Sequence, residues 1–545
     1  HITRGGDGFE PQVDPTDPNI VYSQAQYGWL VRFNKATGER VNIKPMERKG
    51  EDAYRWNWDA PLIISPHDNK RLYFAANKVF KSDDRGNTWE VISEDLSQQI
   101  DRNTLKVMGT TWGPDAVALH KSTTIYGNIV SINESPVQEG LLYAGTDDGL
   151  IHMTEDNGGS WKKMNSFPGI PANTYVMDIR GDVKDAGTVY AVFNNHKQGD
   201  FKPYILKSTN KGAAWTSITG DLPEKGAIYT LRQDPVDPNL IFVGTEYGVF
   251  FTLDGGKKWV QIKGGLPTIA VRDMEIQERE SDLVLATFGR GFYVLDNFAP
   301  LRNMADTTGK DAHILPIKDA LIFNQTNPMG TRGKGSQGEA FFTADNPPIG
   351  AVINFYLADN IETLTEARRK AEKKIRKDGG DVVYPPMDDL REEDLEQKPY
   401  LLFEIKDAKG NVVSRYTDKG KKGLNKSVWN YRMEPTSPVQ LKERKPGRYG
   451  SPDWGALVLP GTYSVTIHKM QGGALTQMAG PTNFKVKMLH DKQIVKADKQ
   501  DLAAFINEVD NARRNIRASG GIVSALKKQA DYMEKAVMQT PKADP

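Results

Sequence analysis

The chain has 545 residues, enough for about three domains, and it contains no cysteine, which excludes disulfides, thiolate metal sites and cysteine nucleophiles. Its 71 Lys and Arg residues balance 70 Asp and Glu residues, which gives no electrostatic case for a nucleic-acid partner or an anionic membrane surface. No run of about 18 apolar residues occurs, so no membrane-spanning helix is expected.

Residues 1–300 repeat one unit: a Pro-rich turn, an apolar run, a Gly turn, a second run and a closing turn. The apolar runs begin near residues 20, 71, 141, 188, 240 and 283, at intervals of 51, 70, 47, 52 and 43 residues. Propeller blades commonly take about 40–50 residues, so the 70-residue interval predicts an insertion within 92–128. The sequence therefore predicts a mainly β chain that starts with about six blades of a β-propeller.

Four of these units close with the pattern Ser/Thr-x-Asp/Asn-x-Gly-x-x-Trp, which we call the Trp turns. They are residues 82–89, 154–161, 208–215 and 252–259. The Asp or Asn can accept backbone amides ahead of it, the Gly supplies backbone freedom, and the Trp can bury against a neighbouring sheet. Asn210 can build such a turn but cannot act as an acid or base. We therefore predict structural roles for the residues Asp84, Trp89, Asp156, Trp161, Asn210, Trp215, Asp254 and Trp259.

The Trp turns resemble the Asp-box, or BNR, repeat of sialidases, two-propeller xyloglucanases and the sortilin ectodomain. The full order of segments resembles bacterial exported proteins with sortilin-like propellers, which are often labelled glycosyl hydrolase. The resemblance implies a periplasmic, outer-membrane-associated or extracellular location. Since the chain opens at His1 with neither an initiator methionine nor a signal peptide, we also expect an N-terminal propeller portion outside it.

Residues 301–340 are predicted to be a connector that ends in the glycine-rich stretch 330–335. Residues 341–490 carry apolar runs typical of a small β-sandwich, loosely similar to immunoglobulin-type modules. The expected strands lie near residues 353–357, 401–405, 428–431, 463–467 and 484–487, with a hairpin turn at 407–411. An insertion at 360–398 joins a basic helical half to an acidic half, and we expect the two halves to attract each other.

Residues 491–545 carry two apolar stripes at helical spacing. The first stripe is Leu502, Phe505, Ile506, Val509 and Ile516, and the second is Ile522, Leu526, Met533 and Val537. Because Gly520 and Gly521 separate the stripes, we predict a helical hairpin. It would need a surface to bury them: its own sandwich, the propeller or another chain.

No catalytic constellation emerges from the residues. The Arg-Ile-Pro signature of sialidases is absent, and two-propeller xyloglucanases use one carboxylate from each propeller, with inverting hydrolysis requiring carboxyls about 6.5–9.5 Å apart. Glu134 and Asp7 are candidates, but each is more simply a turn residue. The eight histidines are scattered without an HExxH motif, so neither a metal nor a cofactor is expected.

Aromatic and Arg residues in predicted loops are the candidates for binding, since such residues are typical of hot spots, although about half would serve packing instead. Arg55-Trp56-Asn57-Trp58-Asp59 places Trp56 and Trp58 on one face if the segment is a strand. The remaining candidates are Tyr27, Trp29, Trp112, Tyr247 and Arg290.

These observations favour a non-catalytic exported propeller that binds a protein, peptide or glycan within a cell-envelope assembly. The alternative is a glycoside hydrolase of the two-propeller xyloglucanase type, whose cleft is shared with a propeller outside this chain. A third hypothesis is a structural scaffold whose terminal helices dock on a partner.

Overall fold

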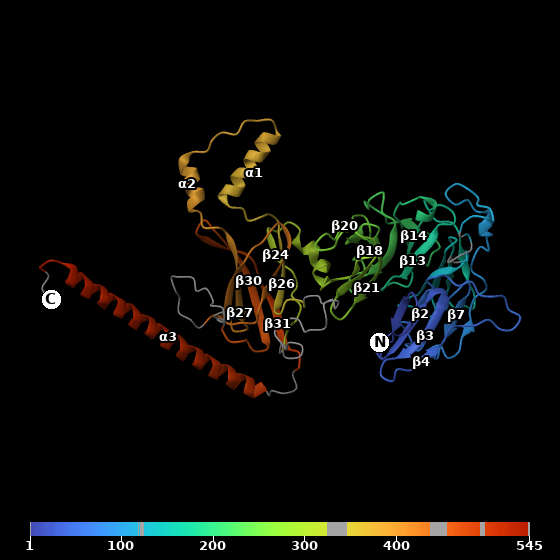
Figure 1. The fold of residues 1–545 in the computed structure, drawn as a ribbon, viewed down its shortest axis with the longest axis horizontal. Coiled ribbons are helices and arrows are strands. Elements are labelled where there is room, and N and C mark those ends of the chain that lie inside the picture. Colours follow the sequence, from blue (N-terminus) through green and yellow to red (C-terminus); the bar gives the residue numbers. More distant parts are fainter. Residues whose placement is uncertain are drawn as a thin grey trace. The chain divides into compact units, whose positions relative to one another are not determined.

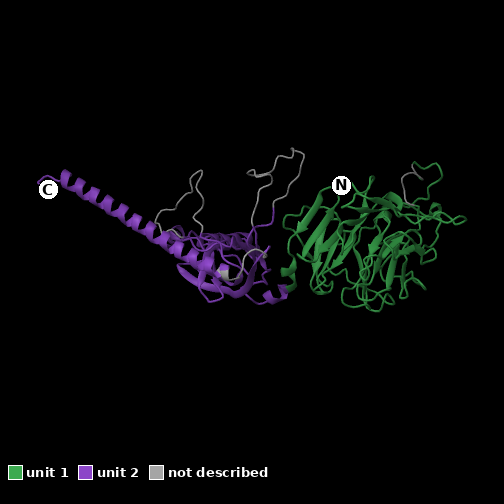
Figure 2. Ribbon diagram, turned by 90° about the horizontal axis from the view of Figure 1, so that it is seen from below, with its two compact units in different colours: residues 1–302 green, residues 303–545 purple. Residues whose placement is uncertain are grey.

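The computed structural model describes residues 2–117, 119, 125–323, 346–435, 455–490 and 496–542. The chain divides into two compact units, His1–Arg302 and Asn303–Pro545 (Figure 2). Unit 1 is built mainly from β-strands, whereas the described part of unit 2 combines β-strands with α-helices (Figure 1). The predicted glycine-rich end of the connector, residues 330–335, lies outside the described residues.

The described part of unit 1 forms six antiparallel sheets that follow one another along the chain, a succession consistent with a propeller-like fold. The first is β1 (Phe9–Val13), β2 (Ile20–Ala25), β3 (Trp29–Asn34) and β4 (Arg40–Asn42), and the second is β5 (Leu62–Ile64), β6 (Leu72–Ala75), β7 (Val79–Ser82) and β8 (Glu90–Val91). The third is β9 (Ile129–Glu134), β10 (Leu142–Thr146), β11 (Ile151–Thr154) and β12 (Lys162–Met164), and the fourth is β13 (Tyr175–Gly181), β14 (Val189–Asn194), β15 (Tyr204–Ser208) and β16 (Thr216–Ser217). The fifth is β17 (Ile228–Gln233), β18 (Ile241–Thr245), β19 (Gly248–Thr252) and β20 (Val260–Gln261), and the sixth is β21 (Val271–Gln277), β22 (Asp282–Thr287) and β23 (Gly291–Leu295). Short 3-10 helices lie at Gln26–Gly28, Arg102–Thr104, His196–Gln198 and Ala299–Thr307.

The second strand of each sheet explains why the sheets stack. Strands β6, β10, β14 and β18 are buried along their whole length, which requires an apolar neighbour on both faces. The apolar clusters supply these neighbours, because each combines residues of consecutive sheets, such as Tyr190 of β14 with Ile241 of β18. The same holds for the other four pairs of consecutive sheets.

Each Trp turn joins the third and fourth strands of a sheet through the same hydrogen bonds. The third residue accepts a bond from the amide four residues ahead: Asp84 from Thr88 at 2.8 Å, Asp156 from Ser160 at 2.9 Å, Asn210 from Ala214 at 2.8 Å and Asp254 from Lys258 at 3.0 Å. The first hydroxyl accepts from the amide of the Gly, as Ser82 does from Gly86 at 2.8 Å. The carboxylates of these turns are thus occupied by the backbone.

The Gly and the Trp of these turns tie each sheet to the one before it. Gly158 has a φ of +95°, and a Cβ at this position would lie 2.5 Å from the carbonyl oxygen of Ile92. Trp161 donates its indole N–H to the same carbonyl at 2.8 Å. Trp89 and Trp259 bond the preceding sheets in the same way, at Ile43 and Ile218, while Trp215 is buried without such a bond.

The described part of unit 2 contains two sheets around one core, formed from the five strands that sequence patterns predict and from three more. The first sheet is β24 (Ala312–Ile314), β26 (Ala351–Leu357) and β29 (Gly423–Trp429), and the second is β25 (Ala320–Ile322), β31 (Ala474–Met488), β30 (Gly461–Gln471), β27 (Tyr400–Asp407) and β28 (Val412–Asp418). The three additional strands are β24, β25 and β28. The prediction of a plain connector over 301–340 is therefore wrong for β24 and β25, whose buried Ala312, Ile314 and Ala320 belong to the core of this unit.

The charged insertion forms α1 (Leu364–Lys377) and α2 (Met387–Leu395). As expected, its halves attract each other: Arg368 of α1 donates to Glu393 of α2 at 2.6 Å.

The predicted helical hairpin at the C-terminus is wrong. Residues Lys496–Gln539 form a single helix, α3, which runs through Gly520 and Gly521 without a break (Figure 1). A glycine costs a helix about 1 kcal/mol relative to alanine, and the many good helix formers on either side outweigh this cost.

Candidate functional site

The two ends of the sheets in unit 1 differ in the loops they carry. Since neighbouring strands run antiparallel, the loops before the first strand and between the second and third strands lie at one end of each sheet. We call this end the loop face. The Pro turns and Trp turns lie at the other end, which we call the turn face. All eight binding candidates predicted from the sequence belong to the loop face.

The first strands carry a repeated irregularity close to the loop face. The pairing register shifts near the start of β1, β9, β13, β17 and β21, so that one extra residue bulges from each strand. The shift in β1 falls at Glu10 and Pro11, that in β17 at Tyr229, and that in β21 at Arg272. Bulges re-aim side chains and recur next to functional sites.

A cluster of charges lies along these first strands. Arg232 of β17 pairs with Asp178 of β13 at 3.2 Å and with Asp273 of β21 at 3.0 Å. Glu10 joins this cluster. Part of its side chain is exposed to solvent, but the surrounding protein removes much of the water around its carboxyl group. This desolvation, followed by the charge of Asp273, raises the pKa of Glu10 to about 7.

A second group of carboxyls gathers around Tyr175, at the start of β13. Burial, followed by the charges of Asp147 and Asp59, raises the pKa of the Tyr175 hydroxyl. Burial raises the pKa of Asp59 to about 6, although its side chain is also open to solvent, and no hydrogen bond to its carboxylate offsets this effect. The pKa of Asp147 rises to about 6 for the same reason, but its carboxylate accepts bonds from the amides of Gly127 and Asn128 and from the Asn128 side chain.

Cations rest on aromatic rings across the loop face. The guanidinium of Arg272 lies 3.9 Å from the ring centre of Tyr229 and 5.0 Å from that of Phe288, and Lys197 lies 4.8 Å from the ring centre of Tyr175. The hydroxyl of Tyr229 donates to Glu246. Sequence reasoning missed Tyr175, Tyr229 and Arg272, and the signal that could have found them is that each is the first or second residue of a first strand.

The structure does not support a shared binding platform at 55–59. This segment is not a strand, so the period-2 argument for Trp56 and Trp58 fails. Trp56 is 7% exposed and stacks on Phe80 at 5.5 Å, which leaves it in the core, and Trp58 packs edge-on against Tyr27 at 5.2 Å. Arg55 bonds Asp95 at 2.6 Å and Ser97 at 2.8 Å, and thereby holds the insertion at 92–128.

Four of the other predicted candidates are exposed to solvent. Trp29 is 56% exposed beneath the guanidinium of Arg4, and Trp112 and Tyr247 are about half exposed. Arg290 is exposed in the loop between β22 and β23. No contact between the Tyr27 and Trp29 group and the Tyr247 and Arg290 group is seen among the described residues.

Both carboxylates weighed as catalytic candidates accept hydrogen bonds from neighbouring groups. Glu134 is buried and accepts bonds from the amide of Gly140 at 3.0 Å and from the hydroxyl of Tyr73. Asp7 accepts a bond from the Gln26 side chain at 2.7 Å.

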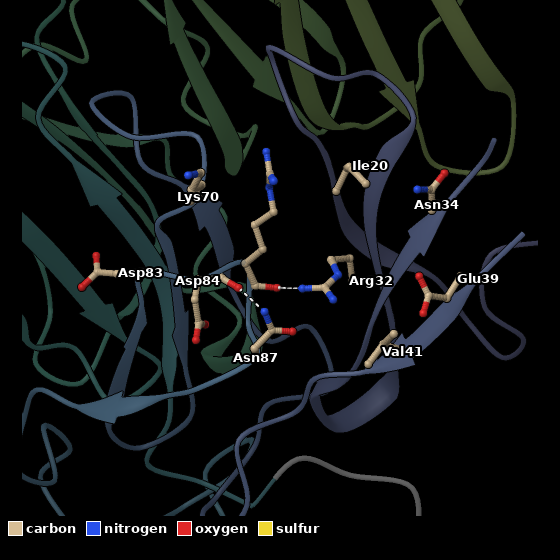
Figure 3. Close-up of a pocket in the computed structure, with 10 residues that line it drawn as sticks. Ile20, Arg32, Asn34, Glu39, Val41, Lys70, Asp83, Asp84 and Asn87 are labelled. Carbon is tan, nitrogen blue, oxygen red and sulfur yellow. Dashed lines mark hydrogen bonds between the residues drawn. The ribbon is translucent and has the colours of Figure 1, made fainter. Parts of the chain in front are cut away.

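Each face has a hollow. On the loop face, a hollow of about 590 Å³ lies beside Arg55, Arg102 and Tyr126, within the size range of small-molecule sites. On the turn face, a hollow of about 480 Å³ lies beside Arg32, Lys70 and Asp83 (Figure 3). Polar groups of the second hollow bond one another, as Arg32 does with the carbonyl of Arg85 at 2.8 Å and Asn87 with that of Asp84 at 2.7 Å (Figure 3).

Within the described ranges, no three His, Asp or Glu side chains are placed together to hold a metal ion. None of the described helices combines the length and the apolar character needed to cross a bilayer.

No family model matches the chain. A curated xyloglucanase from Paenibacillus sp. is 26% identical over 249 residues, which is 42% of this chain and 23% of that protein. Xyloglucanase Xgh74A of Acetivibrio thermocellus is 25% identical over 261 residues, 42% of this chain and 28% of that protein. Among solved structures, an ancestral GH74 enzyme matches with a TM-score of 0.39 and 16% identity, over 53% of this chain and 36% of that chain.

The chain thus spans about a quarter of the length of the curated relatives it matches. Their similarity supports a xyloglucanase-like propeller in this chain, whereas the sortilin-like and Asp-box parts of the resemblance stay predictions.

Proposed function

We propose that the loop face binds a β-linked polysaccharide of the xyloglucan type and that Asp59 serves as an acid in its hydrolysis. The observation that carries the proposal is the position of Asp59, an exposed carboxyl on the loop face that directly follows Trp58, the ring paired with Tyr27, and accepts no described hydrogen bond. Its pKa, raised to about 6 by desolvation, supports the role. The sequence similarity to xyloglucanases supplies the substrate class.

The exposed aromatic rings provide the binding. Trp29, Tyr247 and Phe288 are 56%, 46% and 65% exposed, and flat apolar rings with a polar rim suit the C–H faces of sugar rings. Arg272, stacked between Tyr229 and Phe288, keeps Phe288 presented to solvent and adds hydrogen-bond donors for sugar hydroxyls.

Asp59 has the proton that glycoside hydrolysis needs. A carboxyl with a pKa near 6 retains its proton at mildly acid pH and can deliver it to the glycosidic oxygen as the bond to the anomeric carbon breaks. A second carboxylate must then activate water. The resemblance to two-propeller xyloglucanases implies that this second group lies on another propeller.

A non-catalytic glycan-binding role is the second candidate. The state of Asp147, the other carboxyl near Tyr175, favours this role. Three N–H groups of Gly127 and Asn128 already bond its carboxylate, so it is not free to act as the second acid or base beside Asp59. A protein ligand, an envelope assembly and an exported location remain predictions in either case.

Xyloglucan hydrolysis by the protein combined with the propeller that supplies the second carboxylate tests the proposal, with reducing ends measured between pH 4 and 8. We expect activity to decline above about pH 6 and Asp59→Asn to lower kcat at least about 100-fold while xyloglucan binding persists. Asp156→Asn is the matched control, because Asn210 shows that an amide builds the same turn.

Binding of xyloglucan by the wild type without release of reducing ends would favour the second candidate. Absence of both binding and hydrolysis would contradict both.

A further inference from the structure

Helix α3 carries an apolar seam, most of whose large side chains are exposed in the single chain. We propose that α3 pairs with α3 of a second copy of this chain in a parallel, two-stranded coiled coil. The seam consists of positions alternately three and four residues apart: Leu502, Phe505, Val509, Ala512, Ile516, Ser519, Val523, Leu526, Ala530, Met533 and Val537. Ten of these eleven positions are apolar, over five heptads.

The seam keeps one phase through the two glycines. Ile516, Ser519 and Val523 continue the alternation across Gly520 and Gly521, neither of which is a seam position. Two helices of a hairpin would have no reason to share a heptad phase. The single helix and the unbroken phase therefore agree with each other and exclude folding back at the glycines.

The seven-residue spacing favours another helix over a flat protein surface. A straight α-helix drifts about 20° for each heptad relative to a strict seven-residue repeat, so the seam would wind about 100° around α3 over five heptads. A partner helix that supercoils with α3 follows such a seam, whereas a sheet face does not. Most seam side chains are open to solvent in the single chain, with Phe505, Ile516 and Met533 61%, 72% and 65% exposed.

The residues that flank the seam are complementary to themselves. In a parallel pair, Glu508 of one copy faces Arg513 of the other, and the two-fold axis forms this opposite-charge contact twice. Gln529 similarly faces Glu534, and Ile522 faces the apolar stem of Lys527. No like-charge pair arises. Val and Ile at Val509, Ile516 and Val523 also favour two strands, because β-branched residues at this heptad position suit dimers.

Light scattering coupled to size-exclusion chromatography of the 545-residue chain tests the pairing. We expect twice the mass of 60.7 kDa for the wild type. Val523→Asp/Leu526→Asp, on the seam, should weaken dimerisation at least 100-fold. Ser524→Asp/Ala525→Asp, in the same turn but off the seam, should remain dimeric.

A monomeric wild type at tens of micromolar, a trimer, or a seam variant as dimeric as the control would overturn the proposal. Near-ultraviolet circular dichroism of the tryptophans in unit 1 checks that each variant is otherwise folded.

Because the chain lacks cysteine, one introduced thiol reports the orientation. Val537→Cys should form an interchain disulfide under mild oxidation, since parallel helices place the two copies of this residue side by side. Antiparallel helices would separate them by about 50 Å. In a mixture of the two single variants Leu502→Cys and Val537→Cys, antiparallel helices would place the two different cysteines side by side. Disulfides that form only between the two different variants would therefore overturn the parallel arrangement.

Discussion

The turn face and the loop face of unit 1 use the same residue types in opposite ways. On the turn face, acids are held by many donors: Asp14 is buried, but bonds from Thr16, Asn69 and Asp17 outweigh burial and lower its pKa to about 2. On the loop face, burial acts on Asp59 without such bonds, and the pKa rises to about 6. Asp95 is an exception there, because bonds from Ser97 and Arg55 outweigh its burial and lower its pKa.

The difference separates structural acids from functional ones. A carboxylate that closes a turn is stabilised as an anion and resists protonation, so it contributes stability and no chemistry near neutral pH. A crowded carboxyl without donors costs stability and keeps a proton available. Substitutions at the two faces should therefore change stability by different amounts, and the following predictions run from the largest expected change to the smallest.

Asp234→Ala should give the largest loss of stability. This fully buried turn-face carboxylate accepts two bonds from Arg302, at 2.6 and 2.7 Å, and one from the amide of Asp237. Removing it leaves the partly buried guanidinium of Arg302 with a bond to the Ser281 hydroxyl at 3.3 Å and no compensating charge, at a cost of about 3–5 kcal/mol. Urea unfolding followed by tryptophan fluorescence measures the change.

Asp59→Ala, measured alongside, is the loop-face counterpart and should change stability by less than about 0.5 kcal/mol. Equal losses for the two variants would contradict the distinction between the faces.

Gly158→Ala should destabilise unit 1 by about 2–4 kcal/mol, because a side chain would adopt a left-handed conformation and also press on Ile92. Gly255→Ala separates the two costs. Its φ is +74° with nothing within 4 Å of a Cβ, so only the strain of about 1–2 kcal/mol should appear. Unfolding midpoints in urea compare them, and a Gly255 variant that loses as much as the Gly158 variant would show that the contact between sheets contributes nothing.

The Trp turns of the turn face could be predicted from the sequence because the hydrogen bonds that close each turn are local. The bonds of Asp84 and Asp254 reach residues no more than four positions away, so a short pattern contains all of the partners. The loop face could not, because Glu10 meets Asp273 and Arg232 only after six sheets have been stacked. The directions of its side chains also depend on the bulges of the first strands, and a single sequence does not reveal where such bulges occur.

The wrong prediction of a hairpin at Gly520 and the conditional argument for Trp56 and Trp58 share one cause. Both applied a local rule: glycine as a helix breaker, and a shared face for alternate residues if 55–59 is a strand. In α3 the propensity of the whole helix outweighs two glycines, and around Trp56 packing against Phe74 and Phe80 determines the conformation of the chain.

Glu10→Gln should raise stability at pH 8 and have little effect at pH 4. The folded pKa of about 7 lies above the unfolded value near 4.3, so the folded state binds this proton more tightly. The stability that Glu10 contributes is therefore complete below about pH 4 and declines as the pH rises towards 7. We expect Tm at pH 8 to increase by on the order of 2 °C.

Glu278→Gln, at an exposed site in the turn after β21, is the control for Glu10 and should leave Tm unchanged at both pH values. A Glu10 variant that is less stable at pH 8 would show that its carboxylate strengthens the cluster around Arg232 and would reverse the sign.

Trp29→Ala should have the smallest effect on stability, because the indole is 56% exposed and its one described ring contact is the cation of Arg4 at 5.1 Å, worth about 0.5 kcal/mol at such a site. Its effect on ligand binding should be larger, since an exposed ring that stabilises little is free to contribute to an interface. Affinity electrophoresis in xyloglucan measures that binding. Trp56→Ala, which empties part of the core, is the control and should show the reverse pattern, a large loss of stability. A Trp29 variant that binds xyloglucan normally would show that this ring is not part of the polysaccharide site.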